Sequence, residues 1–242
     1  MNLNPVNMNL NNKVAIVTGA SSGLGAEFSR SLVNHGVRVY GLARRLDRMN
    51  SLQSEIGSEF IPIECDVTDE ESVKDVFFGI ERLDILINNA GLGRFGTVDG
   101  QTKQDWDVQI ETNLTGVYLC THYGVPLMKD QNQHTGFGGH IINIASVAGL
   151  VGNANLSAYN TTKFGLRGFS EATMKELRSD GIKVSCICPG SVETEFASVA
   201  GSKGAPNPME AQDIADTVIH VLQAPDNYLI SEVVMRPLRP RG

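Results

Sequence analysis

Two polar side chains that are four residues apart could move a proton. Tyr159 and Lys163 fall in a stretch with helical periodicity, so they lie on one face of a helix, one turn apart. A carbonyl oxygen needs a proton as its carbon accepts hydride, but a tyrosine with a pKa of about 10 exchanges protons poorly at neutral pH. A neighbouring ammonium favours the phenolate and lowers that pKa. The spacing therefore predicts an acid–base pair, although a packing aromatic beside a solvated amine would have the same spacing.

A glycine-rich segment, residues 18–25, connects an apolar strand to a helical stretch and could bind an anion. Glycines at such a turn let the backbone approach a pyrophosphate closely and pack the helix against the sheet. The helix N-terminus offers unpaired N–H groups and a partial positive charge. The segment predicts a dinucleotide-binding turn formed by Gly19, Ser21, Ser22, Gly23, Leu24 and Gly25.

The end of the second predicted strand bears on the choice of cofactor. In dinucleotide-binding folds an acidic residue there binds the ribose 2′-hydroxyl, whereas an arginine accommodates a 2′-phosphate. Ala43 stands where the carboxylate is expected, and Arg44 and Arg45 follow it. An arginine can contact a phosphate through two parallel hydrogen bonds. The pattern predicts NADP(H) in preference to NAD(H), with two solvated surface arginines as the alternative explanation.

The glycine spacing of the turn resembles that of the short-chain dehydrogenase/reductase family, and the resemblance extends from Lys13 to about Arg236. The further motifs occur in the order of that family: Asp66-Val67, the segment 88–91 (Asn-Asn-Ala-Gly), Asn113, Ser146, Tyr159 with Lys163, and Pro189-Gly190 with Thr194. The resemblance implies an enzyme, an NADP(H)-dependent oxidoreductase that transfers hydride between nicotinamide and a carbonyl or secondary alcohol. It also implies a single-domain, Rossmann-type, doubly wound α/β fold with a seven-stranded parallel sheet and helices on both faces.

The same resemblance implies a role for each residue. Tyr159 would be the general acid or base, and Lys163 would lower its pKa and hydrogen-bond the nicotinamide ribose. Ser146 would hold the substrate oxygen, and Asn113 would anchor a water that connects Lys163 to solvent. The implied cofactor contacts beyond the turn are Arg44, Arg45, Asp66, Val67, Asn88, Ala90, Tyr159, Lys163, Pro189, Val192 and Thr194, with Asn89 bracing the sheet.

These residues need a scaffold, and the apolar pattern alternates between short strand-like runs and longer helical ones. Such alternation predicts right-handed βαβ units and a parallel sheet. Strands are predicted at 13–18, 37–42, 60–64, 84–88, 140–145, 183–187 and 228–235, and helices at 24–34, 69–80, 104–127, 157–179 and 209–222. No internal repeat or linker divides the chain. We therefore expect one domain over residues 13–242, after a flexible leader at residues 1–12.

Composition excludes several classes of partner. The net charge of −7 argues against nucleic acid and anionic membrane surfaces, and no apolar run reaches the length of about 20 residues that spans a bilayer. The cysteines, Cys65, Cys120, Cys186 and Cys188, lie in apolar stretches. A Cys-x-Cys pair without a nearby histidine is a poor zinc site. We predict no metal, and free buried thiols in the cytoplasm.

The substrate is not predicted. The pocket is expected between residues 92–95, 147–156 and 193–208, the last being either a lid or an ordinary surface loop. Arg94 favours an acidic substrate, but Glu193 and Glu195 favour a polar or cationic one. Three functions remain: a ketone or aldehyde reductase that is reversible as a 3-hydroxy-acid dehydrogenase, a 3-oxoacyl-thioester (acyl-carrier protein) reductase, and a catalytically silent nucleotide-binding regulatory protein. The family resemblance also implies a homodimer or homotetramer that assembles through the two long helices.

Overall fold

A seven-stranded parallel sheet forms the centre of the molecule. The computed structural model describes residues 8–196, 200 and 207–238. The strands are β1 (Val14–Thr18), β2 (Arg38–Ala43), β3 (Phe60–Glu64), β4 (Ile85–Asn88), β5 (Gly139–Ile144), β6 (Ile182–Pro189) and β7 (Glu232–Met235). Their order is β3-β2-β1-β4-β5-β6-β7, and each neighbouring pair is parallel. The chain winds outward from β1 to β3 and then from β4 to β7, which confirms the predicted doubly wound fold.

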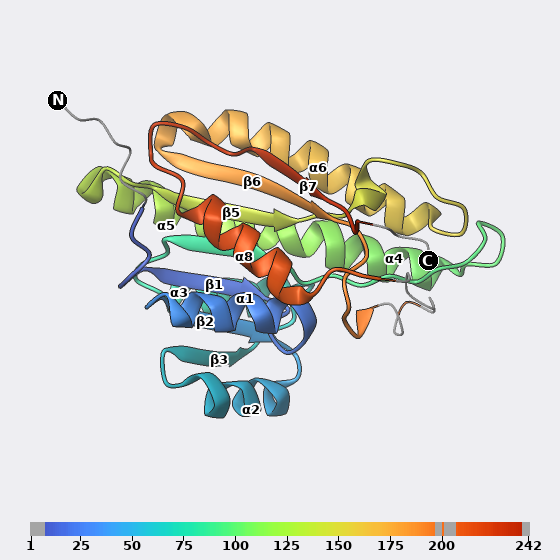
Figure 1. Cartoon of the computed structure of the whole chain (residues 1–242), viewed down its shortest axis with the longest axis horizontal. Helices are drawn as coiled ribbons and strands as arrows, with labels where there is room; N and C mark the ends of the chain where they lie inside the picture. The colour runs from blue at the N-terminus through green and yellow to red at the C-terminus, as the bar shows by residue number, and fades with distance from the viewer. Residues whose placement is uncertain (1–7, 197–199, 201–206, 239–242) are drawn as a thin grey trace.

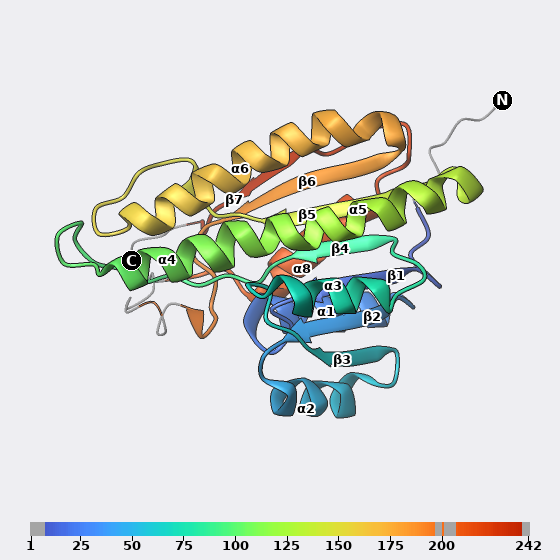
Figure 2. The same cartoon turned by 180° about the vertical axis from the view of Figure 1, so that it is seen from behind.

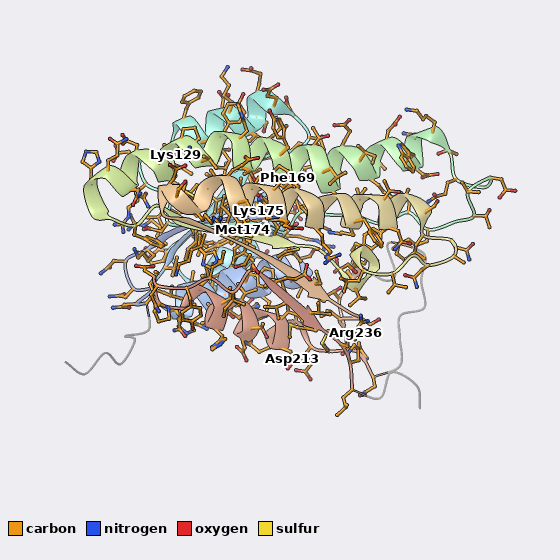
Figure 3. The ribbon with its side chains drawn as sticks, turned by 90° about the horizontal axis from the view of Figure 1, so that it is seen from above. Lys129, Phe169, Met174, Lys175, Asp213 and Arg236 are labelled. Carbon is orange, nitrogen blue, oxygen red and sulfur yellow. The ribbon has the colours of Figure 1, made fainter. Side chains whose placement is uncertain are left out.

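Helices cover both faces of the sheet. They are α1 (Gly23–Asn34), α2 (Leu46–Ile56), α3 (Glu70–Phe78), α4 (Lys103–Ile110), α5 (Gly116–Thr135), α6 (Ser157–Leu177) and α8 (Ala211–Leu222). Helices α1 and α8 lie in front of the sheet in Figure 1, and α3 and α5 lie in front of it in Figure 2. Figure 3 separates the layers from above, with Lys129 of α5 and Met174 of α6 on one side and Asp213 of α8 on the other.

The alternation of side chains along β1 explains why both faces must be covered. Ala15 and Val17 are buried in one core with Phe28 of α1, and Ile16 is buried in a second core with Val73 of α3. Successive residues of a strand point to opposite faces, so a strand that is apolar throughout needs a helix layer on each side. The continuous apolar run that predicted β1 is the signature of this burial.

Three elements differ from the sequence-based predictions. Helix α2 was not predicted, because only Met49 and Leu52 of its eleven residues are buried and its apolar stripe is short. The predicted helix 104–127 extends from Lys103 to Thr135 and contains a π-helical turn, η1 (Glu111–Thr115). Strand β7 is half as long as predicted and begins at Glu232.

The segment before β1 packs against the domain from Met8 onward. Leu10 is buried in the core that also holds α1 and α8. The Met8 amide donates to the Gln223 carbonyl, and the Asn12 amide donates to the Gly36 carbonyl, both at 2.9 Å. Residues 1–7 of the leader predicted at 1–12 lie outside the described part of the chain. In that part, no helix is long and apolar enough to cross a membrane.

Candidate active site

The turn between β1 and α1 has the shape of an anion cradle. Gly19 and Gly23 have positive φ angles of 68° and 53°, which residues with a Cβ rarely adopt. A Cβ at Gly25 would overlap the carbonyl oxygen of Gly19, so α1 starts directly against the turn. The first N–H groups of a helix have no intrahelical partners. They and the helix dipole can therefore bind a phosphate at this point.

The ends of β1 and β4 are joined beneath this turn. Thr18 Oγ1 accepts hydrogen bonds from the backbone amides of Asn89 (3.0 Å) and Ala90 (2.9 Å), and Asn89 Nδ2 donates to the Thr18 carbonyl at 2.9 Å. The Asn88 side chain is buried and donates to Asn143 Oδ1 at 2.9 Å. Asn89 thus connects two strands at the turn, whereas the amide of Asn88 stabilises the interior of the sheet.

Two arginines converge on the turn from the end of β2. Arg45 donates hydrogen bonds to Ser21 Oγ (3.0 Å) and Ser22 Oγ (2.8 Å). Arg44 is exposed, and its Nη1 lies 3.8 Å from Asp66 Oδ2. Both arginines are predicted cofactor contacts; Arg45 reaches the serines of the turn, whereas Arg44 lies beside Asp66. The two guanidinium groups make this corner of the site positive.

The residues after β3 lie beside Arg44. Asp66 Oδ1 accepts hydrogen bonds from the Thr68 amide (3.0 Å) and hydroxyl (2.9 Å), which fixes the carboxylate. Val67 is buried against the first residue of α5, where a Cβ at Gly116 would lie 2.8 Å from a Val67 methyl carbon. Asp66 and Val67 therefore border the positive corner, one with a fixed carboxylate and the other with an apolar side chain.

Ser146, Tyr159 and Lys163 meet at the carboxyl end of β5. Ser146 follows β5 and caps the short helix η2 (Val147–Gly149), whereas Tyr159 and Lys163 lie near the start of α6. The Ser146 side chain lies close enough to the Tyr159 hydroxyl to lower the tyrosine pKa. Lys163 Nζ lies 5.7 Å from the centre of the Tyr159 ring and donates to the Ile144 carbonyl at 2.9 Å. Ser146, from the segment after β5, thus lies beside Tyr159 and Lys163 of α6.

Burial dominates the proton affinities of this group. It raises the pKa of Tyr159 to about 12, while the neighbouring Ser146 side chain lowers it. It lowers the pKa of Lys163 to about 8, against the opposing effect of Cys186 and Cys188. The lowering of the tyrosine pKa by Lys163 stays a prediction, because burial and Ser146 are the influences that this geometry shows. At neutral pH, Tyr159 therefore carries its proton and can donate it.

The π-helical turn η1 positions Asn113 beside the same group. Asn113 is fully buried; its Nδ2 donates to the Leu92 carbonyl (2.8 Å) and Thr162 Oγ1 (3.1 Å), and its Oδ1 accepts from the Leu92 amide (2.9 Å). A Cβ at Gly91 would lie 3.3 Å from Asn113 Oδ1 and 3.7 Å from Lys163 Nζ. Asn113 thus ties the loop after β4 to α6, close to Lys163. Such π turns are frequent at functional sites, and nothing in the sequence predicted this one.

The loop after β6 crosses the site. Val192 forms a β-bridge with Met209, which fixes the loop just beyond Pro189, the last residue of β6. Thr194 lies over the turn, since a Cβ at Gly23 would be 3.4 Å from Thr194 Cβ. The predicted lid, 193–208, is described only at 193–196, 200 and 207–208; its other residues lie outside the described part of the chain.

The next two residues of this loop contact opposite sides of the site. Glu195 forms an ion pair with Arg48 on the first turn of α2, with 2.8 Å between Oε2 and Nη1. Phe196 packs against Tyr159, with their ring centres 5.7 Å apart. Arg48 lies on α2, a helix that the sequence did not predict. Its pairing with Glu195 connects segments 147 positions apart and left no signal in the sequence.

A second phenylalanine completes an aromatic group around Tyr159. Phe95, from the loop after β4, meets Tyr159 edge to face with ring centres 5.5 Å apart, and its ring centre lies 6.4 Å from that of Phe196. Both phenylalanines belong to segments predicted to line the pocket, but neither was singled out. The signal that could have found them is that Phe95 is the only aromatic residue of segment 92–95 and Phe196 the only one of segment 193–208.

Two cysteines lie behind Lys163. All four cysteines are free and buried, as predicted. The sulfur atoms of Cys186 and Cys188 are 3.9 Å apart, and a carboxylate oxygen of Glu232 lies within 4.8 Å of them. Arg167 donates to both oxygens of that carboxylate, at 2.8 and 3.0 Å. The arginine thus holds Glu232 as an ion pair.

Comparison with known protein families identifies the family of this chain. A family model described as short chain dehydrogenase matches residues 13–204. The chain belongs to this family. The short-chain dehydrogenase family model therefore covers the glycine turn, Asn113, Ser146, Tyr159 and Lys163, and it extends into the loop after β6.

Three curated relatives resemble this short-chain dehydrogenase over almost their whole length. Dehydrogenase/reductase SDR family member 11 of Gallus gallus is 36% identical, with 93% of this chain and 96% of that protein aligned. Serine 3-dehydrogenase of Rhizobium radiobacter is 34% identical, with 92% and 93% aligned. Farnesol dehydrogenase of Aedes aegypti is 34% identical, with 93% and 96% aligned.

Solved structures of similar proteins include complexes with nicotinamide dinucleotides. A metagenomic short-chain oxidoreductase in complex with NADP has a TM-score of 0.82 and 33% identity, with 96% of this chain and 99% of that chain covered. The closed form of serine dehydrogenase complexed with NADP+ has a TM-score of 0.83 and 28% identity, covering 92% and 94%. A 3-ketoacyl-(acyl-carrier-protein) reductase from Brucella melitensis complexed with NADH has a TM-score of 0.88, covers 96% and 100%, and shows the fold alone at 24% identity.

Proposed function

We propose that this oxidoreductase uses NADP(H) to interconvert a carbonyl group and an alcohol, with Tyr159 as the acid–base residue. One observation carries the proposal: Ser146, Tyr159, Lys163 and Asn113 converge at the carboxyl end of the parallel sheet. Open α/β sheets bind their ligands at that edge, where the strand order reverses. The glycine turn after β1 lies at the same edge, so a dinucleotide there would reach the four residues.

The residues present fit a dinucleotide. A Cβ would fill the cradle at Gly19 and Gly25, and the N-terminus of α1 begins at the turn. The remaining cofactor contacts are proposed for Ser21, Ser22, Gly23, Leu24, Arg44, Arg45, Asp66, Val67, Asn88, Ala90, Tyr159, Lys163, Pro189, Val192 and Thr194. When bound, the nicotinamide would supply or accept the hydride. The protein's own part is to bind it, to orient the substrate oxygen and to move a proton.

Two features support NADP(H) over NAD(H). Ala43 puts no carboxylate at the end of β2, and Arg45 sits on the serines of the turn with Arg44 beside it. A 2′-phosphate would therefore meet the two cations Arg44 and Arg45. The metagenomic relative and serine dehydrogenase, both above 25% identity, were solved with NADP. If an acidic residue stood at position 43, as in folds that bind NAD, it would repel the 2′-phosphate.

In the direction of reduction, Tyr159 gives its proton to the substrate oxygen. The pKa of about 12 keeps Tyr159 protonated, and Ser146, which lies beside the Tyr159 hydroxyl, would hold the same substrate oxygen. As the proton leaves, the phenol becomes negative, and the ammonium of Lys163 near the ring stabilises that charge. Asn113, close to Lys163, anchors the path by which a proton returns from solvent. A buried neutral tyrosine is thus the form that can donate the proton needed for reduction.

We also propose that the chain is a homodimer or homotetramer, and that it works in the cytoplasm. A groove of about 270 Å³ between α5 and α6 is lined by Leu114, Thr115, Tyr118, Leu166 and Phe169. An apolar groove on the two longest helices suits a second copy of the chain. Four free buried thiols suit a reducing compartment.

The proposed function is tested by following NADPH and NADH oxidation with aldehydes, ketones, 3-oxo acids and 3-oxoacyl thioesters. NADPH is expected to be oxidised with carbonyl substrates, and Tyr159→Phe should lower kcat by about 100-fold or more while NADPH affinity is kept. Near-normal turnover by Tyr159→Phe would remove the assigned role. In a second arm, Ala43→Asp combined with Arg44→Ser and Arg45→Ser should shift the preference toward NADH, and an unchanged preference would place the 2′-phosphate contact elsewhere.

A further inference from the structure

The rings of two phenylalanines lie beside the ring of Tyr159. Phe95 comes from the loop after β4, and Phe196 comes from the loop after β6, at the end of the molecule where both loops lie (Figure 1). Their ring centres are 5.5 and 5.7 Å from that of Tyr159, and 6.4 Å from each other. Three rings from three segments therefore form one contiguous apolar surface beside the phenol.

The three aromatic side chains differ in how far they are exposed to solvent. Tyr159 is only 7% exposed, whereas Phe95 and Phe196 are each half-buried. Both phenylalanines thus cover the tyrosine and keep part of their own surface open. A substrate oxygen that hydrogen-bonds Tyr159 and Ser146 brings its substituents against those open ring faces. Aromatic faces of this kind gain free energy from burying apolar groups and lose it from burying charged ones.

The charged residues of the two loops are directed to other partners. Arg94, which precedes Phe95, is exposed and acts on Asp105 at the start of α4, whose pKa it helps to lower. Glu195, which precedes Phe196, pairs with Arg48 of α2. Lys163 Nζ lies 5.7 Å from the centre of the Tyr159 ring and donates to the Ile144 carbonyl. A substrate carboxylate against the rings of Phe95 and Phe196 would lose its hydration, while the two neighbouring cations, Lys163 and Arg94, have other partners.

We infer that Phe95 and Phe196 are the specificity-determining residues of the pocket, and that they select ketones or secondary alcohols whose substituents are apolar, such as aryl or alkyl groups. Carbonyl compounds with a carboxylate near the reacting carbon, including 3-oxo acids and the products of hydroxy amino acids, are disfavoured. The inference rests on the proposed function and adds a substrate class to the same site. It also bears on the conflict between Arg94 and Glu195, because the side chains of both interact with partners other than Tyr159.

The experiment compares a neutral 3-oxo ester with the corresponding carboxylate. Wild-type enzyme is assayed with NADPH on ethyl 3-oxobutanoate and on 3-oxobutanoate, with 4-phenyl-2-butanone as an aryl-substituted ketone. We expect kcat/KM for both neutral ketones to exceed that for the acid by about tenfold or more, the effect of burying one uncompensated polar group. Equal or better turnover of the acid overturns the inference.

Variants then assign the preference to the two rings. Phe95→Ala and Phe196→Ala should each lower kcat/KM for 4-phenyl-2-butanone by about 10- to 100-fold, mainly through KM, since each removes one buried aromatic contact. Turnover of 3-oxobutanoate should fall much less than that of the ketone, and Phe196→Leu should restore most of the loss caused by Phe196→Ala. Phe78→Ala, on an exposed ring at the end of α3, is the matched control and should have no effect.

The outcomes separate this inference from the proposed function. If neutral ketones are reduced but Phe95→Ala and Phe196→Ala lose acid and ketone turnover alike, the rings are structural and the inference fails alone. If NADPH binds, as measured by fluorescence titration, but no carbonyl substrate oxidises it, the proposed function fails and the inference fails with it. A selective loss for the apolar ketones, with NADPH affinity unchanged, supports both.

Discussion

The pKa values of Tyr159 and Lys163 depend on how deeply these side chains are buried where α6 packs near the end of β5. Both Tyr159 and Lys163 are almost fully buried, so the neutral form of each side chain is favoured. For a tyrosine this means a raised pKa, and for a lysine a lowered one. The lysine hydrogen-bonds a backbone carbonyl of β5, Ile144, and not the phenol. Its effect on Tyr159 must therefore come from charge rather than from direct contact.

The lysine pKa gives a pH prediction. Lys163 titrates at about 8, so its positive charge is present below that pH and is lost above it. Since the ammonium stabilises the phenolate that forms as Tyr159 gives up its proton, kcat/KM for reduction should be flat below about pH 8 and fall roughly tenfold per pH unit above it. The measurement is the pH profile of ketone reduction, with NADPH affinity determined at each pH.

A matched variant isolates the lysine. Lys163→Arg keeps a positive charge at all these pH values, so whatever activity remains should show no fall near pH 8. A wild-type profile that stays flat well above pH 8, with NADPH still bound, would show that the charge of Lys163 is not needed. A fall that persists in Lys163→Arg would assign the titration to another group.

At the scale of elements, the junction between β1 and α1 limits what residue 25 can be. A Cβ at position 25 would overlap the Gly19 carbonyl oxygen, which is backbone and cannot rotate away. Gly25→Ala should therefore push α1 from the turn, lowering stability by about 1–3 kcal/mol. For a domain of this size, that corresponds to a fall in Tm of about 2–4 °C per kcal/mol. Thermal unfolding and NADPH titration measure the two consequences.

The control for this variant lies in another helix. A Cβ at Gly168, in the middle of α6, would meet no atom within 4 Å, so Gly168→Ala fits without overlap. Alanine also has the higher helix propensity, by about 1 kcal/mol. Gly168→Ala should keep or raise Tm and keep NADPH affinity. If Gly25→Ala behaves in the same way, the turn is not the tight junction described above.

Local patterns predicted the elements that bury a continuous apolar stripe or strand, and missed those that do not. Strand β1 could be predicted because all its residues are apolar or small, whereas α2 buries only Met49 and Leu52. The proximity of Tyr159 and Lys163 could be predicted, because the two residues are four positions apart in a helix. Contacts made by tertiary packing left no local pattern: the π turn at Asn113, the reach of Arg45 to the turn, and the approach of Phe196 to Tyr159. The burial that raises the pKa of Tyr159 could not be predicted either, because burial depth cannot be deduced from spacing.

At the scale of the whole molecule, a histidine at the edge opposite the site makes folding sensitive to acid. His140 of β5 is buried, hydrogen-bonds Ser185 Oγ at 2.8 Å and has a pKa lowered to about 3 by burial, with Lys183 adding to the effect. The unfolded chain binds a proton at its ordinary pKa of about 6.5, while the native state does not. The stability from neutral His140 is thus fully present above about pH 6.5 and is lost as pH falls toward 3.

This linkage can be measured by urea unfolding. Between about pH 7.5 and pH 5, His140 should account for a loss of about 2 kcal/mol in the free energy of unfolding. His140→Gln removes the titrating group but keeps a donor for Ser185, so its stability should change less over the same range. His134→Gln, on the exposed end of α5, should retain the wild-type dependence. Equal slopes for wild type and His140→Gln would show that another group causes the acid sensitivity.

The proposed oligomer makes a prediction about the outer surface of α5 and α6. Tyr118 of α5 is 50% exposed beside the apolar groove, and Phe169 lines the same groove where α6 runs next to α5 (Figure 3). If a second copy covers this surface, as we propose, Tyr118→Glu would bury a charge in the interface and should shift the enzyme to monomers. Analytical ultracentrifugation at micromolar concentration measures the change, with Val98→Glu, an exposed apolar residue on the loop before α4, as the control. A wild-type monomer, or an oligomer that Tyr118→Glu leaves intact, would place no partner on these helices.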